Sequence, residues 1–152
     1  MNKIKKAILF TSPVYTNKDW LDINPMPPMG LGYLAAVLRA RGIEVMIFDS
    51  IIEGWDVREE IDDKIIRLGA PFSAIKALIA DFRPDLVGVN MLFTRQKDNA
   101  HKIFSIAKSI DEKIVTIAGG PHATVMPADV LSDEHVDFVA IGEGERTISD
   151  LI

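Results

Sequence analysis

Short apolar runs alternate along the chain with segments that have a helical period. Five runs have the pattern of strands covered on both faces, and they lie at residues 7–10, 44–48, 86–89, 114–118 and 136–141. Between the runs, apolar residues recur at positions i, i+3, i+4 and i+7, which predicts helices over residues 31–38, 75–82 and 100–107. Another helix is expected to begin near Glu145.

This alternation predicts an α/β fold of the flavodoxin-like, doubly wound type. We expect a five-stranded parallel sheet in the strand order 2-1-3-4-5, with helices on both faces. The connection over residues 51–82 is long for one helix. Asp56 can cap a helix that begins at Val57, and Gly69 can end it, so two helices are expected between the second and third strands.

Composition adds limits to this prediction. The 152 residues suit one domain, and 17 basic against 22 acidic residues give a net charge of −5, which argues against nucleic-acid binding. The absence of cysteine excludes a thiolate zinc site, an iron–sulfur cluster and a thiol nucleophile within this chain. No run suits a signal peptide or a membrane span, so a cytoplasmic protein is expected. The pattern stops in mid-helix, and we expect a longer parent polypeptide or, as the alternative, a domain whose last helix is short.

Ligands of such sheets bind outside the carboxyl ends of the strands, so the loops after the strands matter most. The loop after the first strand covers residues 12–29 and is longer than the usual connection of about 2 to 6 residues. It contains Tyr15, Trp20 and several prolines and apolar residues. This composition favours a lid or a contact surface.

Two glycine motifs follow the fourth and fifth strands. Residues 119–124 read GGPHAT and residues 142–145 read GEGE. Glycine permits positive φ and close approach of the backbone to a bulky ligand, although each motif could also form a simple turn. Their position at the same edge of one sheet favours a binding role.

A dinucleotide site is an alternative interpretation. Residues 30–35 match G-x-G-x-x-A, and Asp49 lies at the end of the second strand, where an acid would bind ribose. The first glycine of that motif must make the turn directly after the first strand, so that the pyrophosphate meets the helix N-terminus. Here Gly30 lies 19 positions beyond Thr11, so this alternative ranks second.

Other chemistries have less support in the sequence. A phosphoacceptor domain would need acids after the first and third strands, where the chain has Thr11, Ser12 and Asn90. His101 and His135 are expected to be solvated or packing residues. Three scattered histidines without cysteine do not predict a metal site built from protein ligands alone.

Four motifs in order resemble one known family. They are PPMGLGYLA at residues 27–35, PDLVGV at residues 84–89, GGPHAT at residues 119–124, and VDFV at residues 136–139 running into GEGE. Together they resemble the N-terminal cobalamin (B12)-binding domain of radical S-adenosylmethionine enzymes, which include methyltransferases and the anaerobic magnesium-protoporphyrin IX monomethyl ester cyclase group. The resemblance covers essentially the whole chain.

The resemblance implies a bound corrinoid. Cobalamin-binding domains carry D-x-H-x-x-G, then S-x-L, then a glycine pair. Here residues 90–92 read NML in place of S-x-L, and 26 residues separate them from Gly119, as in those domains. The D-x-H-x-x-G motif is absent, which implies a cobalamin without a protein histidine ligand and with the long loop under the corrin.

The resemblance also implies partners and contacts. The parent would carry a C-terminal radical domain with a 4Fe-4S cluster and S-adenosylmethionine, and this chain alone would be inactive. A domain that binds nothing and serves only for docking is a further alternative. The expected cofactor contacts are Tyr15, Trp20, Asn90, Leu92, Gly119, Gly120, Pro121, His122, Thr124, Gly142, Glu143 and Gly144.

Overall fold

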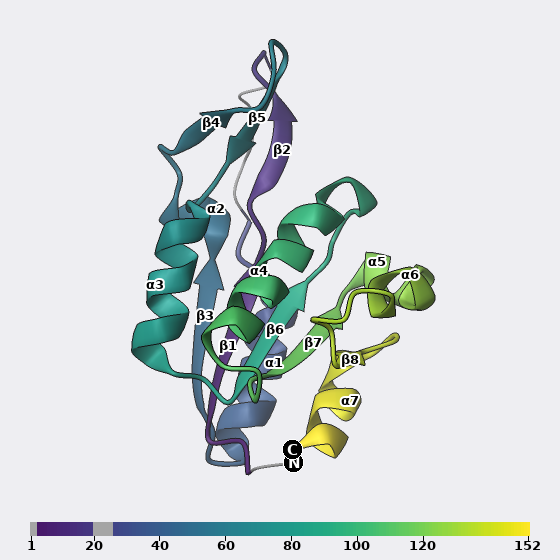
Figure 1. Cartoon of the computed structure of the whole chain (residues 1–152). Coiled ribbons are helices and arrows are strands. Elements are labelled where there is room, and N and C mark those ends of the chain that lie inside the picture. The colour runs from purple at the N-terminus through teal and green to yellow at the C-terminus, as the bar shows by residue number, and fades with distance from the viewer. Residues whose placement is uncertain (1–2, 20–25) are drawn as a thin grey trace.

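The computed structural model describes residues 3–19 and 26–152. Its main sheet has five parallel strands in the order β3-β1-β6-β7-β8, which confirms the predicted fold class and the order 2-1-3-4-5 (Figure 1). The strands are β1 (Lys6–Thr11), β3 (Glu44–Asp49), β6 (Leu86–Asn90), β7 (Val115–Gly119) and β8 (Phe138–Val139).

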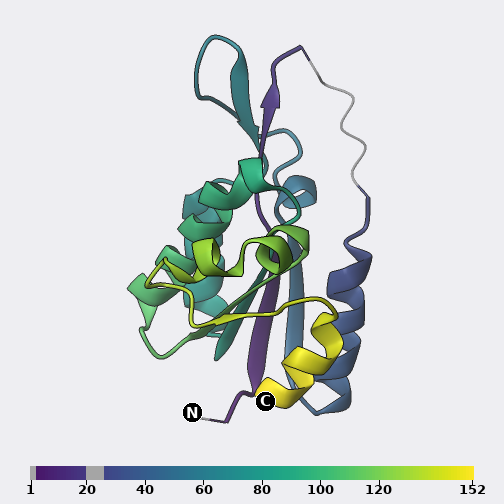
Figure 2. The ribbon, with the colours of Figure 1, turned by 90° about the vertical axis from the view of Figure 1, so that its right-hand side faces the viewer.

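Helices cover both faces of this sheet. One face carries α3 (Phe72–Phe82) and α4 (Lys97–Ile110), and the other carries α1 (Met29–Ala40) and α7 (Gly144–Leu151) (Figure 2). Side chains alternate along β1, so Ile8 packs into one hydrophobic core under α3 and α4, and Leu9 packs into a second core under α1 and α7. The shorter elements are α2 (Ser50–Glu53), η1 (Thr94–Gln96), α5 (Pro121–Val125) and α6 (Pro127–Leu131). In residues 3–19 and 26–152, no helix has both the length and the apolar character needed to cross a membrane.

A second, antiparallel sheet extends beyond the carboxyl ends of the main strands (Figure 1). It consists of β2 (Val14–Asn17), β5 (Ile65–Leu68) and β4 (Arg58–Glu60), in the order β2-β5-β4. The helix predicted to begin at Val57 with Asp56 as its cap is therefore wrong. Part of the expected lid loop is also a strand, because β2 pairs with β5.

Two local features explain the hairpin. The Asp62 side chain accepts hydrogen bonds from the backbone N–H groups of Lys64 and Ile65, both at 2.7 Å, and so closes the turn between β4 and β5. Ile66 and Leu68 are buried whereas their neighbours are only half-buried, which is the two-residue period of a strand. Pairing with the distant β2 thus overrides a helical spacing that the same apolar residues also satisfy.

Asp137 joins β7 to the segment that leads into β8. Its carboxylate accepts hydrogen bonds from the Thr116 backbone N–H at 2.8 Å and from Lys108 Nζ at 2.6 Å. Burial acts to raise the pKa of Asp137, but the bonds from Lys108 and Thr116 outweigh it and hold the pKa below the usual 3.8. The carboxylate therefore stabilises the fold above about pH 4, and this contribution is lost as the pH falls through the lowered pKa.

We expect Asp137→Asn to lower the free energy of unfolding at pH 7 by about 1 to 2 kcal/mol, since it weakens charged hydrogen bonds on a partly exposed group. The difference from the unmodified chain should shrink as the pH falls below 4. Urea unfolding at pH 7 and pH 3 measures both values, with the exposed Asp56→Asn as the matched control. An equal difference at both pH values would show that the ionised Asp137 carboxylate is not the source of the lost stability.

Candidate functional site

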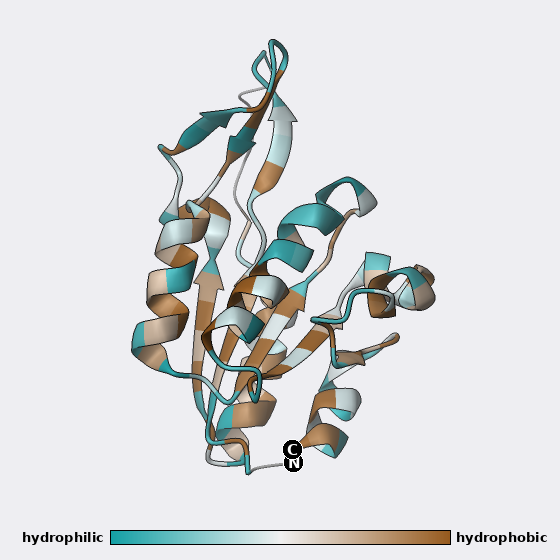
Figure 3. Ribbon diagram, viewed as in Figure 1, coloured by the Kyte–Doolittle hydropathy of each residue, from teal (hydrophilic) through white to brown (hydrophobic). Residues whose placement is uncertain are grey.

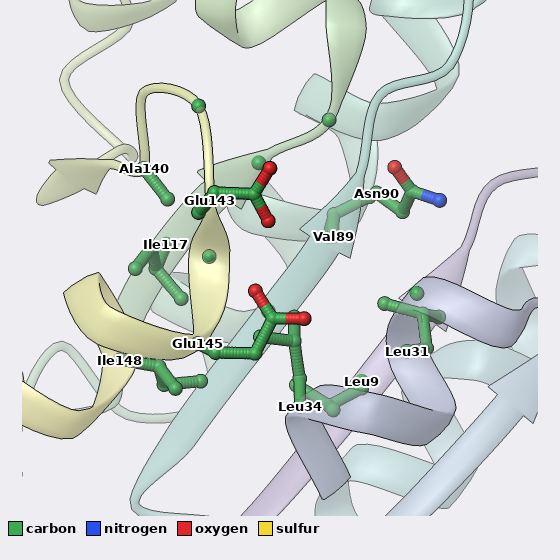
Figure 4. Close-up of a pocket in the computed structure, with 16 residues that line it drawn as sticks. Leu9, Leu31, Leu34, Val89, Asn90, Ile117, Ala140, Glu143, Glu145 and Ile148 are labelled. Atoms are coloured by element: carbon green, nitrogen blue, oxygen red, sulfur yellow. The ribbon is translucent and has the colours of Figure 1, made fainter. Parts of the chain in front are cut away.

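A mostly apolar pocket lies at the carboxyl ends of β6 and β7, on the face of the sheet that α1 and α7 cover (Figure 4). Its volume is about 220 Å³. The apolar side chains that line it come from both helices and from the sheet, and they include Leu9, Leu31, Leu34, Ile117, Ala140 and Ile148. The hydrophobic core under α1 and α7 is therefore open to solvent at the carboxyl ends of the strands.

Gly88 belongs to the floor of the pocket. It lies in the middle of β6 between the neighbouring strands, and a Cβ there would lie 2.8 Å from Leu9 Cδ2 and 3.5 Å from Ile117 Cγ2. A side chain at this position would collide with Leu9, which already lies against the glycine. Glycine here lets Leu9 pack closely on β6 at the floor of the pocket.

The glycine turn after β7 forms one wall. Gly120 has φ +93° and ψ −179°, a conformation that only glycine adopts readily, and a Cβ on it would lie 2.2 Å from Asn90 Oδ1. The turn is fixed by backbone hydrogen bonds from Met91 N–H to the Gly119 oxygen at 2.8 Å and from His122 N–H to the Met91 oxygen at 3.0 Å. The Asn90 amide therefore lies next to the half-buried glycine backbone at the mouth of the pocket.

The loop after β8 forms the opposite wall. Thr124 Oγ1 donates a hydrogen bond to the Gly120 oxygen at 3.0 Å and accepts one from the Gly142 N–H at 3.1 Å, so this side chain ties the two glycine turns together. Glu143 and Glu145 flank the start of α7, and their carboxylates point into the space between α7, β6 and α1 (Figure 4). The pocket therefore has an apolar floor and polar groups near its mouth.

Exposed apolar side chains follow the same strand ends. Leu92 and Phe93 come after β6 and are 45% and 56% exposed, and Ile141 after β8 is 59% exposed. Val125 and Met126, at the end of α5, are exposed as well. Figure 3 shows apolar positions among the polar ones at this end of the sheet. We call this group, Leu92, Phe93, Val125, Met126 and Ile141, the apolar rim.

The structure brings together only part of the predicted contact set. Six of these residues line the pocket: Asn90, Gly119, Gly120, Gly142, Glu143 and Gly144. Leu92 belongs to the apolar rim, Pro121 is the exposed first residue of α5, and Thr124 connects the two walls. The two glycine motifs thus do meet at one edge.

The lid residues do not join this pocket in the described structure. Tyr15 lies on β2 and lines a different, more open hollow with Asn17, Ile65 and Arg95. Trp20 lies outside the described residues.

His122 lies away from the pocket. Its side chain is only 1% exposed, and its Nδ1 lies 3.1 Å from Thr94 Oγ1. Within residues 3–19 and 26–152 its Nε2 has no hydrogen-bond partner. This atom lies 3.9 Å from Asp129 Oδ2, which accepts a hydrogen bond from Lys97 at 2.9 Å. Side-chain hydrogen bonding and charge from Lys97 lower the pKa of Asp129. His122 is therefore buried behind the glycine turn, against Thr94 just before α4.

Sequence reasoning missed several lining residues. They are Leu9, Gly30, Leu31, Leu34, Gly88, Val89, Ile117, Ala140, Glu145 and Ile148. The G-x-G-x-x-A segment contained one clue, since Gly30 does lie at the pocket, at the start of α1. Asp49, the other half of the dinucleotide pattern, is engaged elsewhere: its Oδ1 accepts hydrogen bonds from Thr11 Oγ1 and the Ile51 N–H, both at 3.0 Å.

Comparison with known families assigns this architecture. The B12 binding domain family matches residues 24–152 of the chain. The chain belongs to the B12-binding domain family. This match confirms the resemblance that the four motifs indicated, and the pocket described above is therefore the pocket of a B12-binding domain.

Curated relatives of this B12-binding domain include larger enzymes. A cytidylyl-2-hydroxyethylphosphonate methyltransferase from Streptomyces wedmorensis is 39% identical over 122 residues, which cover 79% of this chain and 23% of that protein. An anaerobic magnesium-protoporphyrin IX monomethyl ester cyclase from Rubrivivax gelatinosus is 29% identical over 146 residues, covering 95% of this chain and 24% of the cyclase. The chain thus spans about a quarter of the length of these relatives.

A solved structure supports the fold. A cobalamin-binding protein from Desulfitobacterium hafniense aligns with a TM-score of 0.63 over 99% of this chain and 60% of its own, at 15% sequence identity. The B12-binding domain therefore shares the architecture of that protein.

Proposed function

We propose that this B12-binding domain holds a cobalamin with its nucleotide tail in the pocket and its corrin ring over the carboxyl ends of the strands. The observation that carries the proposal is the open, mostly apolar pocket at the carboxyl ends of β6 and β7, which both glycine turns line. Concave, mostly apolar sites with a few polar groups at the mouth are typical of cofactor binding.

The size of the pocket decides which part of the cofactor enters. Pockets for whole drug-sized ligands measure about 300 to 1,000 Å³. A volume of about 220 Å³ is too small for a corrin ring but suits a base with its ribose. The ring would then lie across the mouth, where the apolar rim offers a surface for its lower face.

Polar groups at the mouth suit the edges of the corrinoid. The Asn90 amide and the backbone of the glycine turns can exchange hydrogen bonds with amide groups and with the tail, and glycine allows these groups to approach closely. We assign cofactor contact to the six predicted residues that line the pocket and to Leu92. Pro121, Thr124 and His122 shape the turns that carry those contacts. Tyr15 and Trp20 are proposed to contact the cofactor from the long segment after β1.

The cobalt is proposed to have no histidine ligand from this chain. The chain has three histidines, all of which lie in described segments. His101 and His135 both bind Asp133 through Nδ1, at 2.6 and 2.7 Å, and neither lines the pocket. His122 is buried against Thr94 on the α4 side. These positions leave the lower face of the corrin to the apolar rim and the segment after β1.

The parent protein is proposed to be a cytoplasmic radical S-adenosylmethionine enzyme, a methyltransferase or a ring cyclase. Two observations support this: the curated relatives include a methyltransferase and a cyclase, and each is about four times as long as the matched segment. A bound corrinoid supplies a cobalt that can carry a methyl group. The chain's own part is to bind and orient the cofactor, while the 4Fe-4S cluster and S-adenosylmethionine would belong to the C-terminal domain.

The test is a titration of the chain with hydroxocobalamin, followed by reduction and electron paramagnetic resonance of the cobalt(II) form. We expect saturable binding at one site per chain and a spectrum without the threefold splitting that an axial nitrogen causes. Threefold splitting would mean that the tail's own base or a histidine binds the cobalt, and it would contradict the proposed combination of an inserted tail and no histidine ligand. A flat titration would instead support a domain used only for docking.

A further inference from the structure

Two carboxylates lie near the mouth of the mostly apolar pocket. Glu143 lies in the turn after β8, and Glu145 lies in the first turn of α7 (Figure 4). No hydrogen bond or ion pair engages either carboxylate within the described part of the chain. Glu143 is exposed and Glu145 is half-buried, so both carboxylates can accept hydrogen bonds from a bound ligand.

The surrounding charges limit what that ligand group can be. None of the described residues that line the pocket is a lysine, an arginine or a histidine. The N-terminus of α7 carries a partial positive charge of about half a unit, which two full negative charges outweigh. An anionic group is therefore repelled, whereas groups that donate hydrogen bonds are attracted.

The negative charge at the mouth of the pocket orients the nucleotide tail of a corrinoid, an inference that rests on the function proposed above. The tail has three parts: an apolar base, a ribose with free hydroxyl groups, and a phosphate. The base suits the floor of Leu9, Ile117 and Ile148, and the phosphate must remain on the solvent side. The ribose then lies at the level of the two carboxylates, and carboxylates are known acceptors for ribose hydroxyls in nucleotide sites.

We propose that Glu143 and Glu145 recognise the ribose hydroxyl groups of the tail and make the domain selective for corrinoids that have a complete nucleotide. Hydrogen bonds to an ionised acceptor are about twice as strong as those between neutral groups. The carboxylates thus add polar selectivity to an apolar pocket.

The experiment compares cobalamin with dicyanocobinamide, which has the corrin ring but lacks the nucleotide, by isothermal titration calorimetry. The unmodified chain should bind cobalamin at least ten-fold more tightly than cobinamide. The double variant E143Q/E145Q keeps the side-chain size and removes both charges, and it should lose about ten-fold in cobalamin affinity without a change for cobinamide. E112Q/E134Q, two exposed acids away from the pocket, is the matched control and should leave both affinities unchanged.

Each outcome has a distinct meaning. Failure of the unmodified chain to bind either corrinoid would overturn the proposed function itself. Equal binding of the two corrinoids would leave cobalamin binding intact and overturn the inserted tail, and with it this inference. A preference for cobalamin that persists in E143Q/E145Q would overturn the role of the carboxylates alone.

Discussion

Replacing Gly120 with alanine is expected to lower the free energy of unfolding by about 3 kcal/mol. At φ +93° and ψ −179° the backbone is in a region that costs other residues of order 1 to 3 kcal/mol. The new Cβ would also lie 2.2 Å from Asn90 Oδ1 and 3.1 Å from the Met91 oxygen, so the turn after β7 would have to move. Urea unfolding followed by circular dichroism measures the loss.

The matched control is Gly32→Ala on α1. A Cβ at Gly32 meets no other described part of the chain within 4 Å beyond its own helix, and alanine favours a helix over glycine by about 0.8 to 1 kcal/mol. This control should therefore stabilise the chain slightly. Similar stability for the two variants would show that the conformation of Gly120 does not constrain the fold.

Replacing Gly119 with valine is expected to weaken cobalamin binding by about 100-fold or more while the fold is retained. Gly119 ends β7 without a positive φ, and a Cβ there has ordinary contact with Ala140 at 3.8 Å. The valine methyl groups would then occupy space that the ligand needs. Calorimetric titration with hydroxocobalamin measures the affinity, and thermal unfolding shows that the variant is folded.

Gly32→Ala again serves as the control, because Gly32 is not among the residues that line the pocket. It should bind cobalamin as the unmodified chain does. Undiminished affinity in Gly119→Val, with a normal unfolding transition, would place the ligand outside this pocket.

The sheet was predictable because each parallel strand is a continuous apolar run. Residues 7–10 and 86–89 became β1 and β6, and the helical period at residues 100–107 became part of α4. The hairpin was not predictable in the same way. Val57, Ile61 and Ile65 satisfy a helical spacing, and only pairing with β2, some fifty residues earlier in the chain, decides for a strand.

The site was predictable where backbone conformation requires glycine. The glycine motifs after β7 and β8 lie at the pocket because both follow parallel strands that end at the same edge. The floor was not predictable, since Gly88 reads as one weak position in an apolar strand until Leu9 and Ile117 are placed on either side. His122 was expected in the site, and its burial behind the turn depends on how α5 packs, which local sequence does not specify.

The shortness of β8 affects how a bulky cofactor can enter the pocket, because the loop after β8 forms one of its walls. Among the described residues only Phe138 and Val139 pair with β7, and side-chain links from Thr124 and Asp137 add to these few backbone bonds. Segments with so few anchors open locally at a small fraction of the cost of global unfolding. Opening of this wall would break the links from Thr124, Asp137 and the Ala140 N–H and leave the central strands intact, so these links set the cost of admitting a bulky cofactor.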